Sequence, residues 1–156
     1  IQNTIGVTWT QGVMGLALDM AGQSGNLATA THNSSLEINN ALTLAAWVRP
    51  AELGNRTVIS KADGNGFELW LVSNGQIEFR LNRGNNGTAY KLRSNYSYSQ
   101  DVGEWIHVAA TFDGNTSKIF INGNEDTSAS YAPFNIGTSA GDLVIGAIGT
   151  VQRFKG

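Results

Sequence analysis

Residues 104–124 read EWIHVAATFDGNTSKIFINGN, and this stretch decides the fold expected for the chain. Apolar residues stand at every second position over 108–112 and again at 119 and 121. A period of two is typical of half-buried β-strands. Between the two runs lie Asp113 and Gly114, which favour a reversal because glycine adopts positive φ and aspartate can bond nearby backbone. The stretch therefore predicts a β-hairpin, and Asn122 and Gly123 predict a second reversal directly after it.

The same alternation continues through the rest of the chain, and helical periodicity is nearly absent. Short apolar runs recur at spacings of about ten residues, with glycine and asparagine between them. This pattern predicts an all-β fold, an antiparallel two-sheet β-sandwich of the jelly-roll type. No linker or repeat divides the sequence, so residues 1–156 are expected to form a single domain. Further strands are predicted within 15–22, 26–30, 42–48, 67–72, 77–82, 90–93 and 143–148, and residues 84–87 are predicted to form a loop.

Composition excludes several kinds of partner. The 156 residues carry a net charge of -2 and only 14% charged residues, which is not the basic footprint of a nucleic-acid-binding domain. No apolar run approaches the roughly 18 residues of a membrane-spanning helix. The absence of cysteine excludes disulfides and thiolate metal sites.

The hairpin and several other stretches resemble the laminin-G-like, concanavalin A-like jelly-roll domains. The matching stretches are WIHVAATFDG with IFING, TLAAWVRP at 43–50, VISK at 58–61, LVIG at 143–146 and RFKG at 153–156. The resemblance runs from about Gly15 to the end of the chain. It implies a lectin-like domain of a secreted or cell-surface protein, with glycans bound on a concave sheet face or its rim.

Members of that family continue after RFKG with one more strand, whereas this sequence stops at Gly156. The resemblance thus implies that a terminal strand is missing. An unpaired strand edge exposes N–H and C=O groups, so self-association through that edge is expected.

Parity places one set of side chains opposite the core. On residues 67–72 these are Glu68 and Trp70, and on residues 77–82 they are Glu78, Arg80 and Asn82. An aromatic ring offers a flat surface to the C–H face of a sugar, and Arg, Asn and Glu can bond its hydroxyl groups. Trp47, Arg49 and His107 are expected on the same side by parity. The predicted ligand-binding set is Trp70, Arg80, Glu68, Glu78, Asn82, Tyr90, Arg93 and His107.

Several of these aromatic and charged residues also have a purely structural explanation. Trp47 corresponds to a tryptophan that the resembled family keeps whatever the ligand, and Tyr90, Tyr96 and Tyr98 are also ordinary strand residues. A cluster of Arg80, Lys91 and Arg93 would suit a sulfated or uronic-acid polymer, but a solvated face balanced by glutamates explains it equally.

The sequence supports a catalytic site or a metal site less well than it supports a sugar-binding surface. Glu68 and Glu78 are the one same-face carboxylate pair that a glycoside hydrolase could use, and the Glu-x-Asp-x-x-Glu run of laminarinase-type jelly rolls is absent. A polysaccharide lyase would need a tyrosine, a histidine and a charge-neutralising arginine in one groove. His107, Tyr90 and Arg80 could supply them, but their spacing in the sequence does not indicate that they meet. Relatives often hold a structural calcium ion, for which Asp19 and Asp63 are the available carboxylates, and calcium needs six to eight oxygen ligands.

The sequence therefore predicts a non-catalytic carbohydrate-binding module, extracellular or on the cell surface, that recognises a polysaccharide and has no cofactor. The alternatives are an adhesion domain that binds a protein, and a glycoside hydrolase or polysaccharide lyase.

Overall fold

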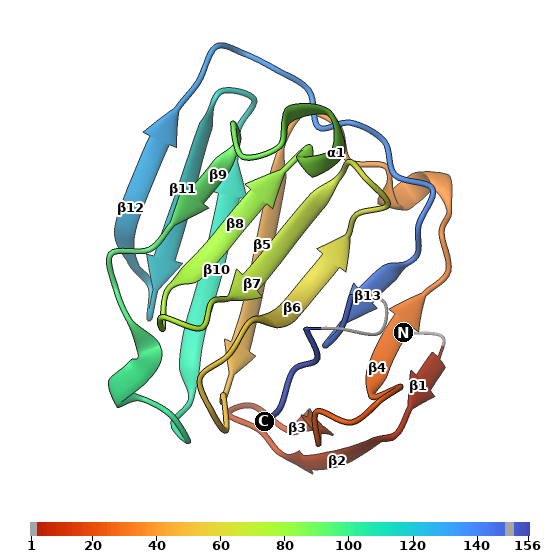
Figure 1. The fold of residues 1–156 in the computed structure, drawn as a ribbon, viewed down its shortest axis with the longest axis vertical. Coiled ribbons are helices and arrows are strands. Elements are labelled where there is room, and N and C mark those ends of the chain that lie inside the picture. Colours follow the sequence, from red (N-terminus) through yellow and green to blue (C-terminus); the bar gives the residue numbers. More distant parts are fainter. Residues whose placement is uncertain (1–2, 149–151) are drawn as a thin grey trace.

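The structure is a computed structural model that describes residues 3–148 and 152–156. Antiparallel strands dominate it, in two facing layers (Figure 1). Three short helical turns connect strands: Ser34–Leu36, α1 (Arg83–Asn86) and Tyr98–Gln100. The strands are β1 (Asn3–Ile5), β2 (Val7–Gln11), β3 (Leu16–Met20), β4 (Leu27–Ala30), β5 (Leu42–Val48), β6 (Arg56–Lys61), β7 (Phe67–Leu71), β8 (Ile77–Leu81), β9 (Lys91–Arg93), β10 (Ile106–Phe112), β11 (Thr116–Ile121), β12 (Asn124–Ser130) and β13 (Leu143–Ile145).

Two sheets form the sandwich, which confirms the predicted fold class. The larger sheet has seven strands in the order β1-β4-β13-β6-β7-β8-β9, and the smaller has four in the order β12-β11-β10-β5. A separate two-stranded sheet, β2-β3, was not predicted and lies at the lower edge in Figure 1. No helix in the described residues has the length and apolar composition needed to span a membrane.

The hairpin of residues 104–124 forms as predicted. β10 pairs with β11 so that Val108 faces Ile121 and Ala110 faces Ile119. At the turn, the Asp113 carboxylate accepts hydrogen bonds from the N–H groups of Asn115 and Thr116, at 3.1 and 2.8 Å. These bonds satisfy turn backbone that the ladder leaves unpaired, so the aspartate fixes the reversal.

The core lies between the two large sheets, because each strand there turns its apolar alternate residues inward. Leu69 and Ile77 from the seven-stranded sheet and Val108 and Ile119 from the four-stranded sheet are fully buried in one cluster. This is the alternation that the sequence predicts for β7, β8, β10 and β11.

Two boundaries differ from the prediction. Residues 84–87 do not form a plain loop, since α1 makes one helical turn there. The strand predicted over 143–148 ends at Ile145, because Gly146 has a φ of 86° and lies against Met20. This backbone conformation favours glycine, and a Cβ at that position would also be 2.1 Å from the Met20 sulfur, which would have to move.

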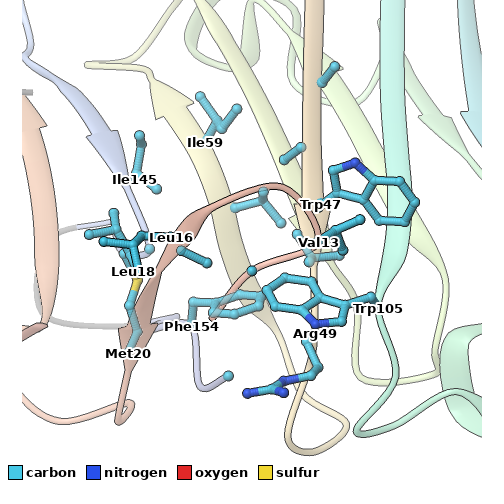
Figure 2. A pocket seen from close by; sticks show the side chains of 18 of the residues that line it. Val13, Leu16, Leu18, Met20, Trp47, Arg49, Ile59, Trp105, Ile145 and Phe154 are labelled. Carbon is cyan, nitrogen blue, oxygen red and sulfur yellow. The ribbon is translucent and has the colours of Figure 1, made fainter. Parts of the chain in front are cut away.

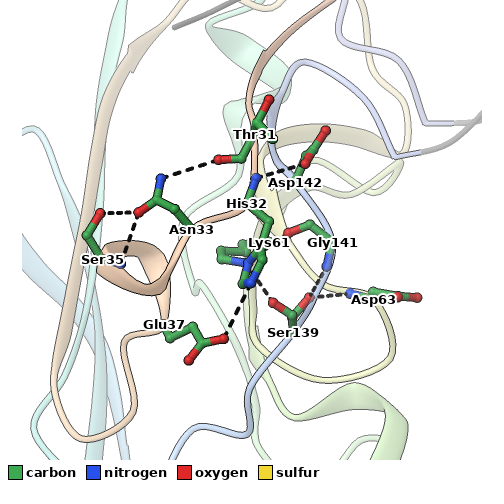
Figure 3. A network of polar contacts seen from close by, with 10 residues as sticks. All are labelled: Thr31, His32, Asn33, Ser35, Glu37, Lys61, Asp63, Ser139, Gly141 and Asp142. Carbon is green, nitrogen blue, oxygen red and sulfur yellow. Dashed lines mark hydrogen bonds and ion pairs between the residues drawn. The ribbon is translucent and has the colours of Figure 1, made fainter.

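A buried lysine ties β6 to the loop before β13 (Figure 3). Lys61 is 1% exposed, and its Nζ donates to the carbonyl oxygens of Ser139 and Gly141 at 2.7 and 2.8 Å. The same Nζ lies 3.0 Å from His32 Nδ1, which accepts because an ammonium group only donates. Burial lowers the pKa of Lys61, and the charges of Glu37 and Asp142 oppose that shift.

Candidate functional site

Charged side chains and one tryptophan gather on the outer face of the seven-stranded sheet. Across β7 and β8, Glu68 faces Arg80 and Trp70 faces Glu78, and across β8 and β9, Glu78 faces Arg93. Residues directly opposite on neighbouring strands share one face, so these five side chains form a single surface. With Arg83 from α1 we call this surface the acid–base patch: Glu68, Trp70, Glu78, Arg80, Arg83 and Arg93.

Each glutamate of the patch is paired with arginine. Arg93 Nε donates to Glu78 Oε2 at 2.7 Å, and Arg80 Nη1 lies 3.8 Å from Glu78 Oε1. On the neighbouring strand, Arg83 Nη1 lies 3.8 Å from Glu68 Oε1. Both glutamates are nearly fully buried, at 2% and 4% exposure, so these pairs hold their carboxylates in fixed positions.

Trp70 lies on the outer face as predicted, but it is buried, not exposed. Its neighbours Leu69 and Leu71 belong to the core cluster, whereas Trp70 does not and is 7% exposed. Arg83 lies over the indole, with its guanidinium carbon 5.6 Å from the ring centroid. The expectation of an open stacking platform at Trp70 is therefore wrong for this conformation.

Several polar atoms of this region are buried without a hydrogen-bond partner. They are Glu68 Oε2, Trp70 Nε1 and Arg80 Nε, together with Oγ1 of Thr57, which faces Trp70 from β6. Each buried polar atom left unpaired costs about 1–3 kcal/mol. Four such atoms on adjacent strands mark a region that hydroxyl groups of a ligand or water can satisfy.

Burial raises the pKa of the Glu68 carboxyl, against the opposing charges of Arg83 and Arg80, and nearby Glu78 adds to the rise. A carboxyl whose pKa is higher in the folded state lowers stability as the pH rises through the unfolded and then the folded pKa. At a pH below both of these pKa values, the carboxyl is protonated in the folded and in the unfolded state, and this destabilisation vanishes.

We therefore expect Glu68→Gln to raise the thermal midpoint more at pH 7 than at pH 3.5. The measurement is thermal unfolding followed by circular dichroism at both pH values, with the exposed Glu104→Gln as control. A Glu68→Gln difference that is the same at both pH values would contradict the assigned shift.

His107 and Trp47 do not join the patch, which corrects the prediction of one common face. His107 faces Trp47 across β10 and β5, and their ring centroids are 5.2 Å apart. These strands belong to the four-stranded sheet, so both side chains lie on the opposite outer face of the sandwich. Arg49, just beyond β5, lies over the ring of Trp105, 5.1 Å from its centroid.

Tyr90 is also outside the patch. Its ring stacks on Phe134 with centroids 3.6 Å apart, and it packs against the core cluster. Tyr98 is fully buried and Tyr96 is partly buried, its hydroxyl donating to Asp101 at 2.6 Å. Tyr90 and Tyr96 are thus half-buried against the core cluster and Tyr98 is fully buried in it, so they do not extend the surface around Trp70.

Asn82 has a structural role at the end of β8. Its φ of 52° lies in the left-handed region, where asparagine is one of the few tolerated residues. Its side chain donates to Asn135 O at 2.9 Å and accepts from Gly137 N–H at 2.6 Å. Asn82 thus ties the start of α1 to a distant loop and so positions Arg83, which the alternation pattern could not reveal.

An apolar groove of about 350 Å³ lies between β3 and β5, apart from the acid–base patch. Leu16 and Leu18 line one part of it, and Trp47, Trp105 and Phe154 line another (Figure 2). Its lining is mostly apolar, and Arg49 is its one charged side chain.

Metal ligands are sparse. Among residues 3–148 and 152–156, no group of three or more His, Cys, Asp or Glu side chains is placed to hold a metal ion. Asp19 is exposed on β3, and the backbone N–H of Asp63 donates to Ser139 Oγ at 2.8 Å. Neither suggested calcium ligand belongs to such a group in the described part of the chain.

A known protein family matches most of the chain. The model described as the concanavalin A-like lectin/glucanases superfamily, a laminin G type, matches residues 21–156. No curated protein sequence matches the chain.

Solved structures with the same fold include toxin and enzyme domains. The binding domain of Paraclostridial Mosquitocidal Protein 1 has a TM-score of 0.76 at 14% identity, over 99% of this chain and 39% of that one. Domain 4 of AbnA, an extracellular arabinanase from Geobacillus stearothermophilus in complex with arabinotriose, has a TM-score of 0.70 at 21% identity, over 96% of this chain and 70% of that one. The botulinum neurotoxin serotype D ligand binding domain in complex with N-acetylneuraminic acid has a TM-score of 0.68 at 17% identity, over 96% of this chain and 38% of that one. The chain thus spans about two fifths of the toxin domains, and at these identities the likeness shows the fold alone.

Proposed function

Because the chain belongs to the concanavalin A-like lectin/glucanase superfamily, we propose that it is a non-catalytic carbohydrate-binding module that recognises an extracellular polysaccharide on the acid–base patch. The observation that carries this proposal is the group of unpaired buried polar atoms beside the Trp70 indole. Sugar hydroxyls both donate and accept, so they can satisfy the Glu68 oxygen, the Trp70 N–H and the Arg80 N–H together.

Ligand entry requires Arg83 to move. Its side chain is 50% exposed, and two contacts hold it: one of 3.8 Å to Glu68, and one with the Trp70 ring, whose centroid is 5.6 Å from the guanidinium carbon. With Arg83 displaced, the face of the Trp70 ring becomes available for stacking on a sugar ring. The patch would then combine one aromatic surface with fixed charged groups, which is the composition expected of a sugar site.

Two similar structures support the choice of ligand class. The arabinanase domain is bound to arabinotriose and a neurotoxin domain to N-acetylneuraminic acid. The arabinanase is extracellular, which supports the same location for this domain. Arabinan and sialylated glycans are therefore the first probes.

The carboxylates favour binding over hydrolysis. A retaining hydrolase needs one free carboxylate as nucleophile and a second as acid. Here Glu78 is not free, because Arg93 donates to it at 2.7 Å and Arg80 lies 3.8 Å from it. Release of reducing sugar from the same polysaccharides, lost in Glu78→Gln, would instead assign the domain to the hydrolases.

We expect the wild-type domain to be retarded in affinity electrophoresis through arabinan or to bind sialylated glycans on an array. Trp70→Ala should weaken that binding by roughly tenfold, since a stacked ring contributes about 1–1.5 kcal/mol. Arg83→Ala should strengthen it several-fold, because the covering side chain no longer has to be displaced.

The matched control is Trp9→Ala, which removes a tryptophan that is 59% exposed on β2, outside the patch. Circular dichroism establishes that each variant is folded, and the exposed Arg83 gives a readout should Trp70→Ala unfold. Binding that neither Trp70→Ala nor Arg83→Ala changes would place the glycan elsewhere on the domain.

A further inference from the structure

One more cation borders the acid–base patch. Lys91 on β9 lies directly opposite Arg80 on β8, so both side chains leave the same face of the seven-stranded sheet. Four cationic side chains thus share this face with two carboxylates: Arg80, Arg83, Lys91 and Arg93 with Glu68 and Glu78. The chain as a whole has a net charge of -2, so the positive excess is local to this face.

Burial divides these charges by sign. The carboxylates of Glu68 and Glu78 are nearly closed to solvent, whereas the side chains of Arg83 and Arg93 are 50% and 40% exposed. Lys91 is half-buried. A ligand that approaches this face therefore meets guanidinium and ammonium groups before it meets a carboxylate.

The two cations of β9 keep hydrogen-bond donors for a ligand. Lys91 forms no ion pair with any residue that the structure describes, and an ammonium group offers three donors. Arg93 pairs with Glu78 through Nε, and a guanidinium has five N–H donors in all. A face balanced by its own glutamates would leave no cation without a partner, so Lys91 does not fit that explanation.

The acidic side chains of the adjacent strand β12 have other partners. The Asp126 carboxylate accepts from the backbone N–H groups of Asn95 and Tyr96, at 2.6 and 3.0 Å. Glu125 is paired with Lys118 at 2.8 Å. Neither carboxylate is ion-paired with Lys91 or Arg93.

The spacing of the patch suits a chain of several sugars. Trp70 and Arg93 lie on either side of Glu78, two strand spacings or about 10 Å apart. Lys91 and Arg93 are two residues apart on β9, which is about 7 Å. A polysaccharide that stacks one ring on Trp70 can therefore place a charged group of another ring beside β9.

Resting on the sugar-binding function proposed above, we propose that the polysaccharide is acidic, a chain of uronic-acid sugars whose carboxylates pair with Lys91 and Arg93 while one ring stacks on Trp70. The planar guanidinium matches a carboxylate in shape and can bind it through two parallel hydrogen bonds. The face already holds two carboxylates with arginine in this way, those of Glu68 and Glu78.

The test is affinity electrophoresis through polygalacturonate and through its methyl ester, which has the same sugar backbone without the charge. Arabinan serves as a neutral polymer, and dextran sulfate with dextran as a sulfated pair. We expect polygalacturonate to bind about tenfold or more tightly than its ester, and this difference should shrink at high salt, which screens exposed charges.

Lys91→Glu should weaken binding to polygalacturonate by about tenfold or more, because it places a like charge beside the carboxylates of the ligand. The matched control is Lys118→Glu, the same charge reversal on β11, which belongs to the other sheet. It should leave the affinity within about twofold. Circular dichroism establishes that both variants are folded.

Preference for the acid over its ester, lost in Lys91→Glu and kept in Lys118→Glu, supports the proposal. Equal binding of acid and ester, or binding of arabinan alone, overturns it and leaves the sugar-binding function intact. Retention by dextran sulfate and not by polygalacturonate also overturns it, since the cations would then serve sulfate groups. Equal losses in the two lysine variants would trace binding to net charge and overturn it as well. A domain that none of these polymers retains would count against both the acidic ligand and the sugar-binding function.

Discussion

We expect replacement of Lys61 by methionine to lower the free energy of unfolding by about 2–4 kcal/mol. The carbonyl groups of Ser139 and Gly141 then lose their donor, and each buried unpaired acceptor costs about 1–3 kcal/mol. Methionine has nearly the length of lysine, so the loss reports the hydrogen bonds and not a cavity. Urea denaturation followed by circular dichroism measures the change.

Lys118→Met is the matched control. Lys118 also makes a short contact, 2.8 Å to Glu125, but both side chains lie in solvent. Exposed ion pairs contribute little, so this control should leave the urea midpoint within experimental error. Equal effects of the two substitutions would mean that the Lys61 bonds do not hold the loop before β13 to β6.

The strands could be predicted because their cause is local. Val108, Ala110 and Phe112 alternate with polar positions, and a strand with one buried face needs only that alternation and a turn residue such as Asp113. The family resemblance rested on the same stretch, and the match over residues 21–156 confirms it.

The candidate site could be predicted only in part, because parity tells which residues leave the core but not which sheet carries them. Glu68 and Glu78 were predicted on one face and are found there, since their strands pair directly. His107 satisfies the same parity rule, yet β10 belongs to the other sheet and carries it to the opposite side. Strand order depends on long-range pairing, which a periodic pattern does not encode.

Exposure could not be predicted either, because it depends on segments without periodicity. Trp70 is covered by Arg83, whose place depends on the left-handed backbone of Asn82 and the single turn of α1. In the sequence, Lys61 is a charged residue at the end of a strand, which would normally be exposed. Only the fold brings the carbonyl groups of Ser139 and Gly141 to its side chain.

Glu78→Ala is expected to lower the free energy of unfolding by about 3 kcal/mol, because it removes one partner of a buried ionic cluster. Glu78 accepts from Arg93 and lies 3.8 Å from Arg80, whose side chain is mostly buried. Without the Glu78 carboxylate, the Arg80 guanidinium remains buried but loses part of the negative charge that compensates it, and this destabilises the folded state. Breaking a buried pair from one side costs more than replacing both partners by apolar groups.

The double variant Glu78→Leu with Arg80→Met separates this cause from lost packing. If uncompensated charge dominates, the double variant is more stable than Glu78→Ala, and the effects of Glu78→Leu alone and Arg80→Met alone are strongly non-additive in the cycle with the double variant. Arg93→Ala should cost only about 1 kcal/mol, since its side chain is 40% exposed. If the loss of unfolding free energy in the double variant equals the sum of the losses in the two single variants, Glu78 stabilises the sheet through packing. The charges of the acid–base patch would then contribute little to the stability of the sheet.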